Sequence, residues 1–226
     1  HQEFAKRNFS TAIKVFTVLA ILQVVVFGAQ MAISVTKNQP EKLASIEGNW
    51  TAESCAPLYL VGWVDESAEK TYAIGVPCLL SLLSYGSFDA TVPGIEKFPK
   101  DDWAPVNLAF QAYHLMIDLG FLFPLIGVVA WFVWWRRKKE RIPRWLLWVC
   151  ISTVFLAEVA TIAGWWTAEV GRQPWVVWKV LRTDAAVSPT LTTGQVLLSL
   201  ITFALLYALL LVLFLFLLDR RIKHGP

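Results

Sequence analysis

Charged side chains are scarce in this sequence. They make up 16% of its 226 residues, whereas hydrophobic residues make up 56%, and the mean hydropathy is +0.53. Soluble domains usually carry about 25% charged residues, and a chain this apolar is not disordered. The net charge of +3 is too small to indicate a polyanionic partner, so we expect no nucleic-acid binding. Three cysteines are too few for a small disulfide scaffold, which leaves an integral membrane protein.

Four long apolar segments carry almost no charge. About 20 helical residues cross the hydrocarbon core of a bilayer, and backbone groups in lipid must pair within their own segment, which favours helices. The sequence therefore predicts an all-α integral membrane protein with four transmembrane helices. They span residues 15–36, 106–135, 145–168 and 192–218.

The positive charges predict the orientation of these helices. Six cations lie among the nine residues 136–144, and smaller basic clusters flank the first helix at 6–7 and the last at 220–223. Basic segments stay on the cytoplasmic side, so both termini are predicted to face inward. The connections 37–105 and 169–191 then face outward, and the first of them holds ten acids against five lysines. We divide the chain into residues 1–36, the outer loop 37–105, and the three-helix region 106–226.

The outer loop contains one apolar stretch and two cysteines. Residues 72–85 are apolar but too short to cross a membrane, and they include Pro77. We expect a helix that lies on the membrane surface or packs under the loop. Cys55 and Cys78 could form a disulfide on the outer side, and the sequence leaves the bridged and free forms open. Cys150, inside the third helix, is expected to be inert packing.

Ionisable residues within a membrane span are functional candidates by default. Glu158, Ile162, Trp165 and Glu169 are spaced 4, 3 and 4, so they form one stripe on the third helix. The two carboxylates are roughly 16 Å apart along the axis. They could deliver protons from one side to a buried site. The alternative is that Glu158 is a neutral, hydrogen-bonded acid between helices.

The second helix offers two residue types that ligate haem iron. His114 and Met116 are two positions apart, so they point in nearly opposite directions and cannot grip one haem from both faces. Only one is expected to be a ligand. Met116 could otherwise be core packing, and His114 could be a satisfied polar group whose ring N–H is accepted by Asp118, one turn away.

The end of the third helix forms a further candidate. Gly171 is predicted to permit a tight turn, and Pro174 to stop the helix. Arg172 lies one turn from Glu169. Its guanidinium could bind a carboxylate or propionate through two parallel hydrogen bonds, or it could simply pair with Glu169.

Twelve residues around this point carry the most specific pattern. They read Gly-Trp-Trp-Thr-Ala-Glu-Val-Gly-Arg-Gln-Pro-Trp at 164–175, and they closely resemble the signature of subunit I of the cytochrome bd quinol oxidases. Shorter matches are Lys-Leu-Ala-Ser-Ile-Glu at 42–47 with Trp50 after it, His-Leu-Met-Ile at 114–117 and Phe-Ala-Lys-Arg at 4–7. The resemblance covers essentially the whole chain. It corresponds to the C-terminal half of the family's subunit I, with a short quinol loop.

The resemblance implies haem-binding roles in the membrane region. Met116 resembles the ligand of low-spin haem b558, and Glu169 resembles the axial ligand of high-spin haem b595. Trp165 resembles an aromatic residue near the haem cluster, and Arg172 resembles the arginine that steadies haem propionates. His114 stands where some relatives carry arginine, so it could contact a propionate or only pack.

In the outer loop, Lys42 and Glu47 resemble the pair implicated in quinol oxidation. We expect Glu47 to lie in a wet environment, where a carboxylate could act as a general base. Lys42 could hold a quinone oxygen or merely pair with Glu47. Some relatives carry an acid at the position of Ile162, where this chain instead has Glu158 one turn inward, so a proton path through Glu158 is implied only loosely.

The resemblance also implies a reaction and a location. Quinol would be oxidised at the outer face of a prokaryotic cytoplasmic (inner) membrane, and haem d would reduce oxygen to water. The cofactors would be haems b558, b595 and d. Protons for water would come from inside, so charge would separate without a proton pump.

The number of haem ligands in the sequence predicts which partner chains the protein needs. A six-coordinate haem needs a ligand on each face, and Met116 is the one usable axial residue that the sequence offers to the low-spin site. The resemblance places the opposing histidine in the N-terminal half of subunit I. Because the sequence starts at His1 and not Met, we expect that half as a separate or cleaved chain. Subunit II, a small accessory subunit and membrane lipid are further expected partners. The alternative function is a non-haem structural or transport module.

Overall fold

The computed structural model describes residues 2–137 and 142–224. The basic connection at 136–144, which carries the strongest orientation signal, therefore lies partly outside the described residues. The chain divides into two units, His1–Ala185 and Ala186–Pro226. Each unit is described by itself.

Four helices in the described residues are long and apolar enough to cross a membrane, which confirms the predicted number. They are Glu3–Asn38, Val106–Arg136, Arg144–Val170 and Thr193–His224. The first begins well before residue 15, because hydropathy marks the stretch that lies in hydrocarbon and not the polar turns that continue the same helix.

The first span is built from three consecutive helical segments. These are α1 (Gln2–Leu22), the π-helical turn η1 (Gln23–Gly28) and α2 (Ala29–Asn38). The other spans of the first unit are α5 (Val106–Arg136) and α6 (Arg144–Val170). The second unit contains α7 (Thr193–His224).

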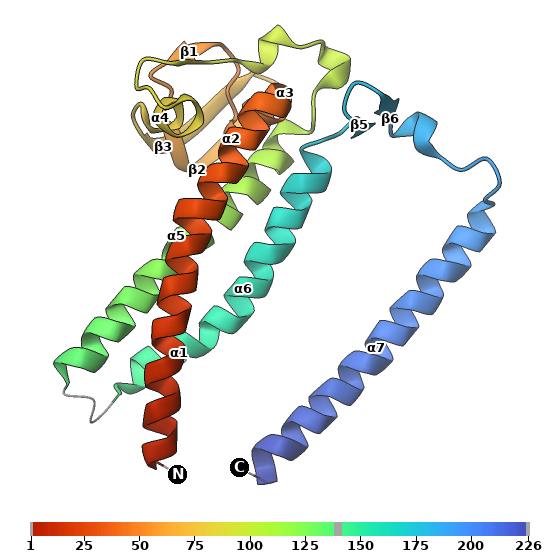
Figure 1. Ribbon diagram of the computed structural model, residues 1–226. Coiled ribbons are helices and arrows are strands. Elements are labelled where there is room, and N and C mark those ends of the chain that lie inside the picture. The colour runs from red at the N-terminus through yellow and green to blue at the C-terminus, as the bar shows by residue number, and fades with distance from the viewer. Residues whose placement is uncertain (1, 138–141, 225–226) are drawn as a thin grey trace. The chain divides into compact units, whose positions relative to one another are not determined.

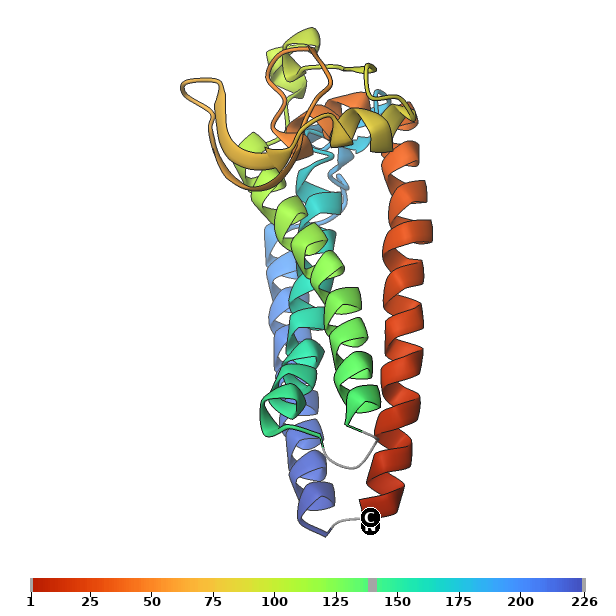
Figure 2. The same ribbon diagram turned by 90° about the vertical axis from the view of Figure 1, so that its left-hand side faces the viewer.

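Within the first unit the spans run side by side in alternating directions (Figures 1 and 2). Small residues bring them close together. A Cβ added to Gly127 of α5 would lie 2.5 Å from the Thr17 hydroxyl of α1, and Ala130 packs with Ile13 and Leu146. The alternation places the connection 37–105 and the end of α6 at one end of this unit. That this end faces outward stays a prediction.

The connection between the first and second spans folds into a small layer of short helices and strands (Figure 1). The sequence analysis did not predict these strands. It begins with α3 (Pro40–Glu47) and ends with two 3-10 turns, η2 (Ile95–Lys97) and η3 (Lys100–Asp102). Between them lie the antiparallel pair β1–β4, the hairpin β2–β3 and a short helix. Their bounds are β1 Glu53–Ser54, β2 Leu58–Asp65, β3 Lys70–Val76, α4 Leu79–Tyr85 and β4 Thr91–Val92.

The expectation of one helix over residues 72–85 is therefore wrong for its first half. Tyr72–Val76 belongs to β3, which pairs with β2 from Asp65↔Lys70 to Leu58↔Val76. Pro77 and Cys78, whose φ is 59°, separate this strand from α4. Pairing with a partner strand decided the conformation, and an apolar run carries no signal of such a partner.

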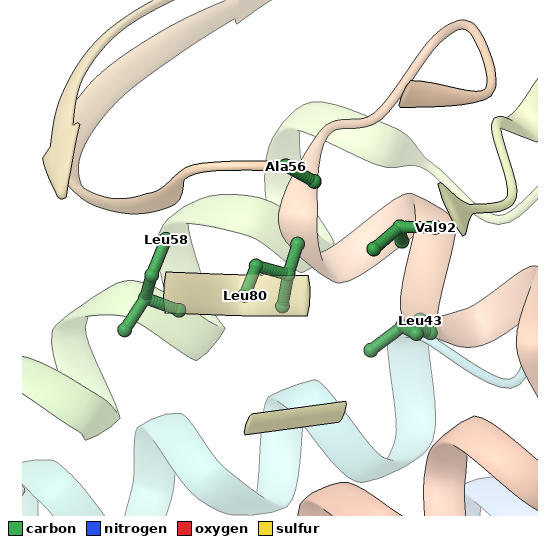
Figure 3. Close-up of a cluster of buried hydrophobic side chains, with 5 residues drawn as sticks. All are labelled: Leu43, Ala56, Leu58, Leu80 and Val92. Carbon is green, nitrogen blue, oxygen red and sulfur yellow. The ribbon is translucent and has the colours of Figure 1, made fainter. Parts of the chain in front are cut away.

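The second half forms α4, which packs into the core of the connection. This is one of the two placements expected for residues 72–85. Five buried side chains converge there from α3, the loop before β2, β2, α4 and β4 (Figure 3). They are Leu43, Ala56, Leu58, Leu80 and Val92. Ser81 ties the same region together, because its hydroxyl accepts from Ala56 N and donates to Ala90 O, both at 2.8 Å. Cys55 and Cys78 form a disulfide.

A second small hairpin follows α6. It consists of β5 (Trp175–Val177) and β6 (Leu181–Arg182), followed by the turn η4 (Asp184–Ala186). Trp178 Nε1 donates to Glu41 Oε2 at 2.7 Å, and Arg182 forms an ion pair with Asp102. These contacts fasten the end of α6 to the outer connection.

Candidate functional site

Lys42 and Glu47 lie on different sides of α3. Five residues correspond to roughly 140° around a helix. The Lys42 ammonium donates to Ala168 O at the end of α6, at 3.2 Å. Glu47 is buried on the side where α3 packs with Ala109 and Tyr113 of α5. The structure therefore does not form the Lys42–Glu47 pair that was one of the two expected roles for Lys42.

Glu47 is enclosed, so the expectation of a wet environment is wrong. Its exposed fraction is 0%, and neither carboxylate oxygen has a hydrogen-bond partner among the described residues. Burial raises the pKa of Glu47 to about 8, and the neighbouring Tyr113 hydroxyl opposes that shift only in part. At neutral pH the group is therefore mostly a protonated acid.

Lys42 lines a pocket of about 80 Å³ between α3 and the segment after α6. Cations, acids and indoles share its wall: Lys42, Arg172, Glu41, Asp102, Trp175 and Trp178. Burial lowers the pKa of Lys42, the nearby Arg172 guanidinium lowers it further, and Glu169 opposes both effects. The pocket is thus a small polar site whose wall includes two indole rings.

Glu169 and Arg172 lie at the C-terminal end of α6 and form an ion pair, with each side chain 40% exposed. The simple pair considered above is therefore present. The predicted turn follows the helix at residues 171–174, but it does not depend on a glycine conformation, because the φ of Gly171, −68°, is ordinary right-handed backbone. Instead, a Cβ at this position would lie 3.2 Å from Lys42 Cε and 3.3 Å from Ile46 Cγ2. The glycine lets α3 pack against the end of α6.

Met116 lies at the interface between α5 and α6. It is half-buried, and its sulfur faces Gly164 so closely that a Cβ there would lie 2.8 Å from Sδ. Gly164 belongs to the same signature as Glu169. The structure thereby places the thioether and that signature on two packed helices.

His114 is buried, with 3% of its surface exposed, and stacks on Phe110 with ring centroids 3.8 Å apart. Its Nδ1 lies 2.8 Å from Phe110 O, one turn earlier in α5. Asp118 is therefore not its partner, contrary to expectation, because the backbone carbonyl of the preceding turn is closer. Nε2 has no partner among the described residues.

Glu158 lies on an exposed stripe of α6 with Ile162 and Trp165, whose exposed fraction is 63%. It makes no hydrogen bond in the described part of the chain, so the expected bonded position between helices is not formed within this chain. Its part in a proton path stays a prediction.

The donor chemistry of two positions fits haem iron. A methionine thioether and a glutamate carboxylate can each supply one axial ligand, and both side chains are only partly buried. Within residues 2–137 and 142–224, no group of three or more His, Cys, Asp or Glu residues could hold a bare metal ion.

The comparisons with known proteins identify the family. Residues 1–226 match the family described as cytochrome bd terminal oxidase subunit I. The chain belongs to this family. The match confirms the resemblance inferred from the signature at 164–175 and the shorter motifs.

Three relatives illustrate the extent of the similarity. The cytochrome bd ubiquinol oxidase subunit 1 of Bacillus subtilis (strain 168) is 33% identical over 235 residues, covering 98% of this chain and 49% of its own length. A second Bacillus subtilis subunit I, named for menaquinol, is 35% identical over 199 residues, covering 87% and 43%. The solved structure of bd oxidase from Geobacillus thermodenitrificans has a TM-score of 0.76 and 25% identity, covering 98% and 56%. The chain thus spans about half the length of these relatives.

Sequence reasoning missed Tyr113, whose hydroxyl neighbours Glu47. Tyr113 directly precedes His114, but a tyrosine in an apolar helix is indistinguishable from core packing. It also missed the strand β2, whose Tyr59 packs against a core cluster that includes Ala44 of α3. The short apolar run at residues 58–64, rich in aromatic and β-branched residues, was the signal that could have indicated this strand.

Proposed function

We propose that this chain is the haem-binding C-terminal part of subunit I of a cytochrome bd-type quinol:oxygen oxidoreductase, active only within a complex. Two B. subtilis relatives are named for ubiquinol and menaquinol. The observation that carries the proposal is the buried Glu47 carboxyl beside a chain-wide family match. A general base works best when its pKa lies near the operating pH, and burial raises the pKa of Glu47 to about 8.

Glu47 would take a proton from the quinol hydroxyl. Lys42 would hold a quinone oxygen from the neighbouring pocket, where it already donates to a carbonyl oxygen. Glu47 does not line that pocket and is fully buried, so the two residues would act from different sides of α3 and not as an ion pair, and quinol would have to open the enclosure of Glu47 to reach its carboxyl. Because the pKa of Lys42 is lowered, its ammonium gives up a proton more readily. It is therefore a better hydrogen-bond donor to a neutral ligand.

The membrane helices would hold the haems. Met116 would ligate low-spin haem b558 and Glu169 high-spin haem b595, with Trp165 beside the haems and Arg172 steadying propionates. When bound, the haems accept the electrons of quinol, and haem d supplies the site of oxygen reduction. His114 offers its unpaired Nε2 to a propionate or another polar group. Glu158 would carry protons along the exposed stripe of α6.

The ligand opposite Met116 would come from polypeptide outside residues 1–226. The relatives are about twice as long as this chain, and the exposed stripe of α6 is a surface that further protein would cover. We expect the N-terminal half of subunit I, subunit II and a small accessory subunit in a prokaryotic inner membrane. Both termini of the chain would face inward.

Replacing Glu47 tests the proposed quinol site. In the purified complex, Glu47→Gln keeps the volume and neutral form of the side chain but cannot accept a proton. We expect quinol turnover to fall roughly 100-fold while the reduced-minus-oxidised haem spectrum stays unchanged. Glu66→Gln is the matched control, because its oxygen can still accept from Asn107 N. Normal turnover in Glu47→Gln would overturn the role, and a complex without haem bands would favour the structural or transport module.

A further inference from the structure

One face of the β2–β3 hairpin packs against the rest of the first unit. Val64 is buried on this face and belongs to a core cluster with Val106 and Phe110 of α5. Its partner in the ladder, Thr71, donates from its hydroxyl to Gly48 O at 2.6 Å. These contacts fix the hairpin against α5 and against the residue that follows α3.

The opposite face of the hairpin carries four large apolar side chains. Successive residues of a strand alternate between faces, and residues directly opposite each other in an antiparallel pair share one face. The pairs on this face are Val61↔Ile74 and Trp63↔Tyr72. The four side chains are 60% to 78% exposed in the described part of the chain. An apolar patch of this kind marks an interaction site.

Two hydrogen bonds set the position of the hairpin along α5. Gln111 Nε2 donates to Gly62 O, and Asn107 N donates to Glu66 Oε1, both at 2.7 Å. The hairpin therefore lies beside the first two turns of α5. Its tip, at residues 65–70, is level with the start of the helix, and its base is nearer the middle of the span.

The length of α5 gives these first turns a depth in the membrane. The helix has 31 residues, which corresponds to roughly 46 Å. A bilayer is about 40–45 Å thick with its headgroup layers and about 30 Å without them. Trp134, Trp135 and Arg136 mark the interface at the far end of α5. The first two turns, and the hairpin beside them, then lie in the headgroup layer of the opposite surface.

The polarity of the exposed face changes in the same direction. From base to tip its pairs are Val61↔Ile74, Trp63↔Tyr72 and Asp65↔Lys70. They are aliphatic nearest the hydrocarbon, aromatic in the middle and charged at the tip. Trp and Tyr are enriched at the level of the lipid headgroups. The face therefore matches the change from hydrocarbon to water across that layer.

We propose that the face formed by Val61, Trp63, Tyr72 and Ile74 lies in the lipid interface of the bilayer and fastens the outer connection to the membrane surface. The match of polarity to depth favours lipid over a protein partner. The hairpin also lies to the left of α5 in Figure 1, whereas α6, whose exposed stripe further protein would cover, lies to the right. The inference does not depend on the proposed role of Glu47.

Spin labels test this placement in the purified complex, reconstituted into nanodiscs of phosphatidylcholine and phosphatidylglycerol. A nitroxide is attached to Val61→Cys or to Ile74→Cys in a Cys150→Ala background, where the disulfide keeps the other two cysteines from reacting. Power saturation measures collisions with O2, which concentrates in lipid, and with a nickel chelate, which stays in water. We expect the ratio of O2 to nickel collisions to be several-fold higher at both positions than at Ser67→Cys. Ser67 is the matched control, because it is exposed at the tip of the same hairpin.

The same measurement distinguishes the other possible surroundings. Frequent nickel collisions at both positions would place the face in water and overturn the proposal. An immobilised label that collides rarely with either reagent would show a protein partner, such as subunit II, and would overturn it as well. An unchanged haem spectrum shows that each labelled complex is assembled. Because Val61 and Ile74 lie opposite each other in the ladder, either variant alone decides the result if the other does not assemble.

Discussion

The outer connection and the membrane helices of the first unit differ in how deeply they bury their candidate functional residues. The connection encloses its candidate residue, since Glu47 is fully buried where α3 packs on α5. The helices leave their candidate residues partly exposed, since Met116 is half-buried and the Glu169 side chain is 40% exposed. A site enclosed by one chain can complete its own environment, whereas a half-open site requires a cofactor or a partner to cover it. Substitutions in the helices should therefore change the haem spectrum, and substitutions in the connection should change turnover.

Met116→Leu should produce the largest effect. Leucine nearly conserves the volume, so little packing is lost, but it offers no sulfur to iron. We expect the low-spin b band to disappear from the reduced-minus-oxidised spectrum of the complex. The chain has two methionines, and Met31→Leu on α2 is the matched control. A normal low-spin band in Met116→Leu would show that Met116 is only core.

Glu169 and Arg172 should differ in severity. Glu169→Ala removes a proposed iron ligand, and we expect loss of the high-spin b signal. Arg172→Ala removes a proposed anion contact, and we expect a weaker or shifted signal. Visible and low-temperature spectra of the two variants make the comparison. Equal and mild changes would favour a plain surface ion pair.

Glu47 should also make stability depend on pH. Its pKa of about 8 in the folded protein lies above the ordinary value of 4.5. Between these values the folded state keeps a proton that the unfolded state loses, so the free energy of unfolding falls by about 1.4 kcal/mol per pH unit as pH rises. Glu47→Gln removes this contribution. The Tm of the variant minus that of the wild type should grow from pH 4.5 to pH 8, and a constant difference would contradict a buried carboxyl.

Gly164→Ala should give the smallest effect and the sharpest test of the helix interface. The added methyl would lie 2.8 Å from Met116 Sδ, so the sulfur must move by a few tenths of an ångström. We expect a shifted low-spin band and a changed midpoint potential, with the haem retained. Gly120→Ala on α5 is the matched control, because nothing lies within 4 Å of its added Cβ. An unchanged spectrum in Gly164→Ala would indicate that Met116 does not ligate the haem.

The sequence by itself determined the membrane class, the four spans and the family. These properties depend on local composition and on short contiguous motifs, such as residues 164–175. It also placed Glu169 beside Arg172, because Arg172 follows Glu169 by three positions at the turn that ends α6.

Only the tertiary structure decided the environment of each candidate residue. Tyr72–Val76 became a strand because β2 lies beside it, and Gly171 is needed because α3 packs against it. Glu47 is fully buried, and its neighbour Tyr113 comes from α5, more than 60 residues away in the sequence. Burial and proximity arise from contacts between segments distant in sequence, and a pKa follows from those contacts. A linear pattern can therefore name the carboxyl but not the surroundings that set its chemistry.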